Sequence, residues 1–340
     1  MTRNEITLLN LGKNLDDLAN LDPRGYGVCK LLYKAAYNFT GKPLCLNSAQ
    51  LLCNTLKKDG MVYILTGFVL APYNKAETDG VISSVLLASV LEKIFDVKTV
   101  IICPEEAVCA VRKLLETIGA KSEIVVFTKD SQKADKMADD ILSSGYPDAV
   151  ISIECPGENK NGVYHNAGGA DVSALEAKTD ILFDKLVRAG VPNIAIGDLG
   201  NEIGMGTVSE CIENQIPSDC PCCGKGGIAV KSKADNIITS TVSDWGCYSL
   251  ICILAFMTDN YDVMHTSELQ SRMMNVAAEN GLIDMGGEHI PAIDGFGVEL
   301  TGLIVDLMRK TMINIADNFD NFQRQFDIIS EKNSFAGELI

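Results

Sequence analysis

Four loops of this chain combine glycine with acidic and amide side chains, a combination that can hold a cation or an ammonium group. In the loop 197–206, Asp198, Asn201 and Glu202 stand among glycines that allow tight turns and close approach of the backbone to a ligand. The loop has neither a Walker lysine nor the dinucleotide-binding spacing, and its acids would repel a bare phosphate. It favours a divalent cation held by hard oxygen atoms, or a substrate ammonium group. The alternative is that Asp198 and Glu202 only cap the following helix.

A second acidic loop, Glu77-Thr78-Asp79-Gly80, opens a predicted helix. Asp79 or Thr78 suits the N-cap position, which leaves Glu77 without a structural role. If these acids face those of 197–206, several carboxylates share a small volume, and a cation or shared protons must relieve their repulsion. The alternative is that the two loops are separate and solvated.

The segment 219–227 holds Cys220, Cys222 and Cys223 beside glycines. A structural zinc site needs four ligands, usually supplied by paired C-x₂-C hooks. Here no histidine is near in the sequence, and Cys211 is the only plausible fourth ligand. The spacing therefore predicts a glycine-rich turn with free thiols and no zinc.

Two further residues have side chains that could act in catalysis. His165 lies in a candidate site loop, where it could titrate near neutral pH or be an ordinary exposed side chain. Ser243 lacks the G-x-S-x-G elbow, so the sequence does not support a hydrolase triad.

These loops are positioned by a repeated pattern of short apolar run, turn and helix that begins at Met61. Each run is rich in Val and Ile and apolar on both faces, as a buried parallel strand is. The predicted strands are 61–65, 99–103, 124–127, 149–153, 193–196 and 237–239. The predicted helices between and after them are 80–95, 105–118, 131–143, 173–189 and 245–257. The fold class is therefore α/β: a mostly parallel, doubly wound sheet of about six strands with helices on both faces and an N-terminal helical segment.

The pattern divides the chain into three parts. Residues 1–58 form the N-terminal helical segment packed on the core, 59–320 the α/β domain, and 321–340 a polar C-terminal tail. Within the domain, 267–318 is expected to form two helices that flank a glycine-rich loop containing Asp294.

In an open parallel sheet, ligands bind at the carboxyl ends of the strands. Because the acidic loops follow strands one, four and five, we predict one acidic pocket that binds Mg²⁺ or Mn²⁺, with Ca²⁺ as a further candidate. The predicted metal ligands are Glu77, Asp79, Glu154, Asp198, Glu202 and Asp294.

Composition limits the class of protein. The 340 residues are 47% apolar, which suits one large α/β domain or two modest ones. A net charge of −16 repels phosphate backbones and anionic lipid, so neither nucleic acid nor membrane is expected as a partner. A small-molecule substrate is expected, and a homo-oligomer is compatible with the sequence.

The cysteines and apolar segments predict a compartment. The 12 cysteines are scattered, mostly within apolar patterns, which is typical of reduced thiols. Residues 1–21 are too polar for a signal peptide, and the longest apolar stretch, 246–257, is about half of a membrane span. The sequence therefore favours a cytoplasmic protein with free thiols throughout.

Over about 22–317, the chain resembles the D-glutamate cyclase-like C-terminal domain family, most specifically in 197–206. It departs from that pattern at Cys155, where a basic residue is usual, and at Leu199, where glycine is usual. The matching segments are Thr66-Gly67, Glu77-Thr78-Asp79-Gly80, Glu154-x-Pro156-Gly157, 197–206 and Val242-Ser243-x-Trp245-Gly246.

The resemblance implies conversion of D-glutamate to 5-oxo-D-proline with loss of water, without a nucleotide cofactor. Carboxylates could take the ammonium proton, a divalent cation could polarise the carboxyl oxygen, and backbone N–H groups after Gly80 and Gly246 could hold the α-carboxylate. Catalysis is assigned to Asp198, Glu202 and Glu77. Substrate binding is assigned to Asn201, Gly200, Thr66, Gly80, Ser243, Trp245 and Tyr164.

Two alternatives stay open. The same residues would serve a metal-dependent hydrolase of a small phosphate ester. Because longer cyclases of this type carry a separate N-terminal domain, the chain could also be a non-catalytic partner of a separate cyclase subunit.

Overall fold

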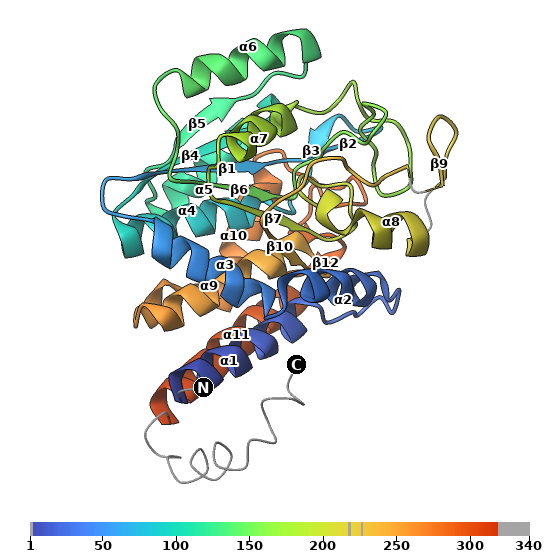
Figure 1. Cartoon of the computed structure of the whole chain (residues 1–340). Helices are drawn as coiled ribbons and strands as arrows, with labels where there is room; N and C mark the ends of the chain where they lie inside the picture. The colour runs from blue at the N-terminus through green and yellow to red at the C-terminus, as the bar shows by residue number, and fades with distance from the viewer. Residues whose placement is uncertain (1–2, 217–218, 226, 319–340) are drawn as a thin grey trace.

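A six-stranded parallel sheet forms the centre of the computed structural model, which describes residues 3–216, 219–225 and 227–318 (Figure 1). The strand order is β10-β7-β6-β1-β4-β5, and every neighbouring pair is parallel. The strands are β1 (Met61–Thr66), β4 (Lys98–Cys103), β5 (Glu123–Val126), β6 (Ala149–Ile153), β7 (Asn193–Gly197) and β10 (Asn236–Thr239). Each predicted strand is confirmed to within one residue at either end.

The central strands form because their β-branched side chains can be covered on both faces. Ile64 of β1 pairs with Ile101 of β4 on one side and Ile151 of β6 on the other, and all three are fully buried. A sheet of this kind needs helices on both faces, since no face is left for water.

The helices wind around the sheet in two directions. From β1 the chain passes through α4 and α5 to reach β4 and β5, and from β6 it passes through α7 to β7 on the other half of the sheet. In Figure 1, α6 and α7 lie on one side of the sheet, while α4 contacts α9 on the other. The helices are α4 (Val81–Phe95), α5 (Val108–Ile118), α6 (Ser131–Leu142), α7 (Thr179–Arg188), α8 (Ser209–Gln215) and α9 (Ser243–Met257).

This winding places the reversal of strand order between β1 and β6, which are neighbours in the sheet. At such a switch point, the loops that leave the two strands diverge to opposite faces and open a crevice at their carboxyl ends. Thr66 ends β1, and Glu154 directly follows β6. The predicted site loops therefore meet where this topology favours ligand binding.

The terminal helices are α1 (Arg3–Ala19), α2 (Val28–Thr40), α3 (Leu44–Thr55), α10 (Ser267–Glu279) and α11 (Val298–Asn318). Helices α1, α3 and α11 pack against α9, and α1 and α11 lie beneath the sheet in Figure 1. Helix α2 contacts β10, and α10 contacts α11 and α5. The buried Asp16 of α1 accepts hydrogen bonds from the backbone N–H groups of Leu44 and Cys45, and so caps α3. Asn20 donates to the carbonyl oxygen of Thr239 at the end of β10. These bonds bring the loop between α1 and α2 to the carboxyl edge of the sheet.

Some elements differ from the prediction. Helix α7 begins at Thr179 rather than at 173, because the segment before it crosses to the neighbouring loop, where the Lys178 N–H donates to the Thr128 carbonyl. Three short hairpins were not predicted, because two-residue strands carry no periodic signal. They are β2 (Val69–Leu70) with β3 (Lys75–Ala76), β8 (Asp219–Cys220) with β9 (Gly224–Lys225), and β11 (Ala292–Ile293) with β12 (Phe296–Gly297).

Two predictions concern features outside the sheet. All 12 cysteines lie in the described residues, and none is paired in a disulfide. Among the helices that the structure describes, none is long and apolar enough to cross a bilayer. The predicted polar tail, 321–340, lies outside the described residues.

Candidate functional site

Three carboxylates converge at the switch point of the sheet. Oxygen atoms of Asp79, Glu154 and Asp198 all lie within 4.8 Å of one another. The three residues follow β3, β6 and β7 respectively, and are only 2%, 6% and 6% exposed. We call these three residues the carboxylate cluster. The structure thus brings together side chains that are far apart in sequence, while their predicted function as metal ligands stays a prediction.

The cluster is electrostatically costly when every member is charged. Burial raises the pKa of Asp79, Glu154 and Asp198 well above their ordinary values, and repulsion between the neighbouring acids raises them further. Burial and mutual repulsion therefore both favour the protonated forms of these acids. The cluster can therefore donate and accept protons, or bind a positive charge.

Asp79 has a structural function as well. Its carboxylate accepts hydrogen bonds from the backbone N–H groups of Ser243 and Asp244, at the start of α9. Asp244 in turn accepts from the backbone N–H groups of Gly80 and Ser83, at the start of α4. Asp244 of α9 thus caps α4, and Asp79, which precedes α4, caps α9. This arrangement aligns the N-termini of both helices with the cluster.

This reciprocal capping uses some of the backbone N–H groups at the starts of the two helices. Gly80, Ser83, Ser243 and Asp244 donate to Asp79 or Asp244, and Gly246 donates to the Val242 carbonyl. That N–H groups after Gly80 and Gly246 hold a substrate carboxylate stays a prediction. Gly80 is also needed for close packing: a Cβ there would lie 2.5 Å from Glu154 Cβ, and its φ is +76°. Only glycine meets both conditions without strain.

Glu154 is held in a strained backbone conformation beside the cluster. Its φ of +44° is uncommon for a residue with a side chain. The Ser243 hydroxyl donates to Glu154 Oε2 at 2.5 Å, so Ser243 contacts the cluster directly. The Thr66 hydroxyl, 3.1 Å from the position of a Cβ on Gly80, is buried without a hydrogen-bond partner.

Glu202 lies within its own loop rather than in the cluster. Its carboxylate accepts backbone N–H groups from Asp198 and Leu199 on Oε1, at 3.0 and 2.8 Å, and from Gly200 on Oε2, at 2.6 Å. These bonds occupy both oxygen atoms and fix the turn that presents Asp198. The observed contacts of Glu202 are those of a positioning residue, and its direct function in catalysis or metal binding stays a prediction.

Glu77 and Asp294 stand next to the cluster. Burial raises the pKa of Glu77 well above its ordinary value, with Asp79 and Asp294 adding repulsion. Asp294 lies close enough to Asp198 for its charge to raise the pKa of that acid, and it forms an ion pair with Arg24, whose Nη2 lies 2.5 Å from Asp294 Oδ2. The same Nη2 donates to the Asp294 carbonyl.

Arg24 is the cation of this site, and sequence reasoning missed it. It lies in the loop between α1 and α2, and its guanidinium is 4.6 Å from the centre of the Phe296 ring. The charges of Asp294, Asp198 and Asp79 oppose the effect of burial and raise its pKa. The available signal was weak: a single arginine in a polar turn of a segment assigned only to packing.

The other residues predicted to bind substrate differ in the contacts that they make. Asn201 Oδ1 and Trp245 Nε1 are buried without a hydrogen-bond partner, while Asn201 Nδ2 donates to the His165 carbonyl. Gly200 has a φ of +103° and packs against Ile212, so it permits the turn. Tyr164 points elsewhere, since its hydroxyl donates to Asp180.

Two more buried acids were missed. Asp244 stands directly before the predicted helix 245–257 and was assigned no function, although it caps α4. Glu176 accepts from the Val69 N–H and lies close enough to raise the pKa of Glu77, and burial raises its own pKa to about 8. Neither residue belongs to a spacing pattern that sequence analysis could recognise.

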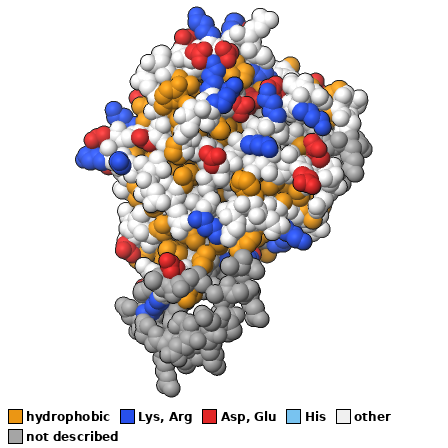
Figure 2. Space-filling view, in the orientation of Figure 1, with side chains coloured by type: hydrophobic (Ala, Val, Ile, Leu, Met, Phe, Trp, Pro, Cys, Tyr) orange, Lys and Arg blue, Asp and Glu red, His pale blue; other side chains and the backbone are white. Residues whose placement is uncertain are grey.

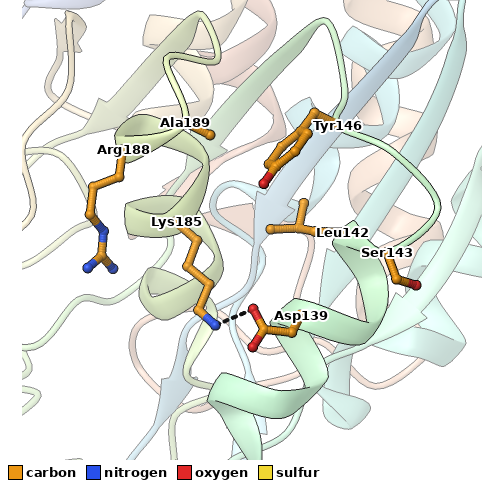
Figure 3. Close-up of a pocket in the computed structure, with 7 residues that line it drawn as sticks. All are labelled: Asp139, Leu142, Ser143, Tyr146, Lys185, Arg188 and Ala189. Carbon is orange, nitrogen blue, oxygen red and sulfur yellow. Dashed lines mark hydrogen bonds and ion pairs between the residues drawn. The ribbon is translucent and has the colours of Figure 1, made fainter.

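On the face drawn in Figure 2, the acidic and basic side chains of the described residues are interspersed. A surface hollow between α6 and α7 is lined by Asp139, Lys185, Arg188 and Tyr146, with an ion pair between Lys185 and Asp139 (Figure 3). It lies near the C-terminal ends of both helices, which is the edge of the sheet opposite the carboxylate cluster.

Comparison with known proteins adds a family. A family model described as "D-glutamate cyclase-like, C-terminal" matches residues 15–309. The human protein named "D-glutamate cyclase, mitochondrial" is 26% identical over 254 residues. That alignment covers 71% of this chain but 38% of the human protein, so the chain matches well under half of that relative's length.

Proposed function

The chain belongs to the D-glutamate cyclase-like C-terminal family, and from that premise we propose that it is a lyase which cyclises D-glutamate, or a related amino acid, to 5-oxo-D-proline with loss of water. The observation that carries the proposal is the carboxylate cluster at the switch point with Arg24 beside it. The named activity of the human relative supports the reaction class.

The charges of the site match those of a glutamate-like substrate. An ammonium group beside the carboxylate cluster would relieve the repulsion that raises the pKa values of its acids. Both described hydrogen bonds of Arg24 use Nη2, and a guanidinium has five N–H donors, so donors remain for a substrate carboxylate. In this proposal, Arg24 binds the substrate carboxylate, which the sequence analysis assigned to backbone N–H groups at helix N-termini.

The reaction balances without an external oxidant or nucleotide. The amine nitrogen attacks the carbon of the γ-carboxyl group, a C–N bond forms, and one C–O bond breaks to release water. Two protons leave the ammonium nitrogen and both are taken up by the departing oxygen. Asp198 and Glu154 suit this transfer, because neighbouring acids with raised pKa values can hold a proton on one oxygen and accept one on another.

A divalent cation fits the same residues, and we propose Mg²⁺ or Mn²⁺, with Ca²⁺ as the further candidate. The donor atoms are hard oxygens, and a separation within 4.8 Å lies in the range that one such ion can bridge. The unpartnered buried oxygen atoms of Thr66 and Asn201 supply neutral donors at the same edge. When bound, the ion would polarise the carboxyl oxygen.

The first experiment measures 5-oxoproline formed from D-glutamate by the full chain, with L-glutamate as the stereochemical control. We expect Asp198→Asn and Glu154→Gln to lower the turnover number by about 10²–10⁴-fold, the range of general acid–base catalysis. Asp139→Asn makes the same chemical change in the hollow of Figure 3, and is expected to keep full activity.

The second experiment measures the melting temperature with and without millimolar Mg²⁺ or Mn²⁺. A cation that binds the folded chain stabilises it by an amount that rises with the logarithm of one plus its concentration over Kd. We expect a rise for wild type and Asp139→Asn, and none for Asp198→Asn. No rise for wild type, or an equal rise for Asp198→Asn, would contradict the metal assignment while leaving the cyclase assignment open.

Two outcomes would replace the cyclase proposal. Metal-dependent release of phosphate from a panel of small esters, without 5-oxoproline formation, would favour a hydrolase. If neither activity is found but the chain restores turnover to a separate cyclase subunit, it is a non-catalytic partner. We further propose a cytoplasmic location, because none of the 12 cysteines is paired in a disulfide. Size-exclusion chromatography tests the proposed homo-oligomer.

A further inference from the structure

A second cluster of metal-binding side chains lies outside the carboxylate cluster. Nitrogen and sulfur atoms of His165, Cys220, Cys222 and Cys223 all lie within 4.8 Å of one another. His165 and Cys220 are buried, Cys223 is half-buried and Cys222 is exposed. The sequence-based prediction of no zinc rested on the missing paired hooks and on the lack of a histidine nearby in the sequence. The fold supplies a histidine that is distant in the sequence, His165, from the loop that follows β6.

The contacts within this group are close. His165 Nε2 lies 3.0 Å from Cys220 Sγ, Cys220 Sγ lies 2.9 Å from Cys222 Sγ, and Cys222 Sγ lies 3.5 Å from Cys223 Sγ. A disulfide would need about 2.05 Å between sulfur atoms. Two sulfur atoms on one tetrahedral zinc, each at about 2.3 Å from it, lie about 3.8 Å apart. The sulfur–sulfur contacts fall between these values, so opening by less than about 1 Å gives the tetrahedral arrangement.

The surrounding backbone holds the four side chains toward one point. Cys220 and Gly224 pair across the β8–β9 hairpin, so Cys220, Cys222 and Cys223 lie on one tight turn. On the other side, a bridge between His165 and Asp171 closes the loop that carries the imidazole. Asn159 links the two segments, because its Nδ2 donates to Cys223 Sγ and to the Gly227 carbonyl. An amide N–H directed at sulfur is typical of the shell around metal-bound thiolates.

We propose that His165, Cys220, Cys222 and Cys223 bind one zinc ion in a structural site. A Cys₃His set is a regular composition for such sites, and four protein ligands leave no open position for chemistry. On binding, the three thiols each lose a proton to solvent and the imidazole binds as the neutral base. The site therefore fastens two loops together and is independent of the cyclase proposal.

The position of the site gives it an effect on the carboxylate cluster. Asn201, in the loop that presents Asp198, donates from Nδ2 to the backbone carbonyl of His165 at 3.1 Å. Fixing His165 thus fixes the partner of Asn201. Zinc at this point would order the loop 197–206 without touching substrate, so the ligands would be positioning residues for that loop.

The test measures metal content in the full chain purified without added metal. We expect about one zinc per chain in wild type, and a loss of zinc affinity of at least about tenfold in Cys223→Ser and His165→Asn, which is the smallest loss typical even of outer-shell partners. Cys109→Ser is the matched control, because Cys109 is exposed on α5 and is not one of the four residues whose ligand atoms converge. It should keep full zinc content.

Cobalt substitution supplies a second readout that folding defects do not imitate. Cobalt in wild type and Cys109→Ser should show thiolate charge-transfer absorption and the visible bands of a tetrahedral ion, and Cys223→Ser should lose charge-transfer intensity. Zinc-free wild type that gives no cobalt spectrum would overturn the proposal. So would full zinc content in both ligand variants, or a disulfide among Cys220, Cys222 and Cys223 detected by mass spectrometry of the non-reduced chain.

Discussion

Replacing Gly80 with alanine tests the close approach on which the carboxylate cluster depends. A Cβ at this position would lie 2.5 Å from Glu154 Cβ and 2.7 Å from the Ile153 carbonyl oxygen. Side chains do not tolerate such contacts, so the start of α4 or the end of β6 must move. The φ of +76° adds strain, because a residue with a Cβ adopts it only at a cost.

The two costs can be separated. Left-handed backbone costs a residue with a Cβ about 1–2 kcal/mol, and overpacking costs about 1–3 kcal/mol. Gly80→Ala should therefore lower the free energy of unfolding by about 2–5 kcal/mol. Gly119 is the matched control: its φ is +68°, but a Cβ there meets nothing within 4 Å. Gly119→Ala carries only the first cost, about 1–2 kcal/mol.

Urea denaturation measures both variants, with the fluorescence of the single buried tryptophan, Trp245, as the probe. Gly80→Ala should also lose 5-oxoproline formation and the proposed stabilisation by Mn²⁺, since it displaces Glu154. Gly119→Ala should keep both. If Gly80→Ala loses no more stability than Gly119→Ala, the close packing of α4 against β6 that we describe is wrong.

Three further predictions follow from the buried charges. Burial raises the pKa of Asp16 to about 6 and of Glu176 to about 8, so the folded chain binds protons more tightly than the unfolded chain. The free energy of unfolding of chelator-treated protein should therefore fall as pH rises from about 4 to about 8. A flat or rising profile in urea titrations would contradict this. Asp244→Ala leaves the N–H groups of Gly80 and Ser83 without their acceptor and should lower the free energy of unfolding by about 2–4 kcal/mol. Asp244→Asn keeps an acceptor and should lower it by about 1 kcal/mol or less. Equal losses of stability in thermal melts would refute the reciprocal capping. Arg24→Gln should lower kcat/KM for D-glutamate by about 10–100-fold, as expected for the loss of one charge-assisted hydrogen bond. Arg188→Gln, in the hollow of Figure 3, should leave kcat/KM unchanged. Similar values for the two variants would show that Arg24 does not bind substrate.

The sheet could be predicted from the sequence because its signal is local. Runs such as 149–153 and 193–196 are apolar on both faces, and only a parallel strand between two helical layers buries such a run completely. The edge of the sheet that carries the site then follows from topology, since the carboxyl ends of parallel strands lie together. Topology alone therefore places Asp79, Glu154 and Asp198 on one edge of the sheet.

Which contacts each residue makes was decided only by tertiary structure. Glu202 and Asp198 have the same glycine-rich surroundings in the sequence, yet Glu202 binds backbone N–H groups of its own turn while Asp198 reaches the cluster. The approach of Arg24 depends on how α1 packs against α9 and on the hydrogen bond from Asn20, which follows α1, to Thr239 at the end of β10. Interactions between residues hundreds of positions apart leave no periodic pattern in the chain.

The cysteines also show that spacing in the sequence does not determine which side chains meet in the fold. Three cysteines within four positions lack the paired hooks of a familiar zinc motif, and spacing alone therefore predicted free thiols. The fourth ligand, His165, comes from a loop 55 positions before Cys220 and reaches the turn only because the loop after β6 folds back on itself. Sequence determines which residues can bind a cation, but chain folding decides which of them meet, because ligand geometry is set by distances in space.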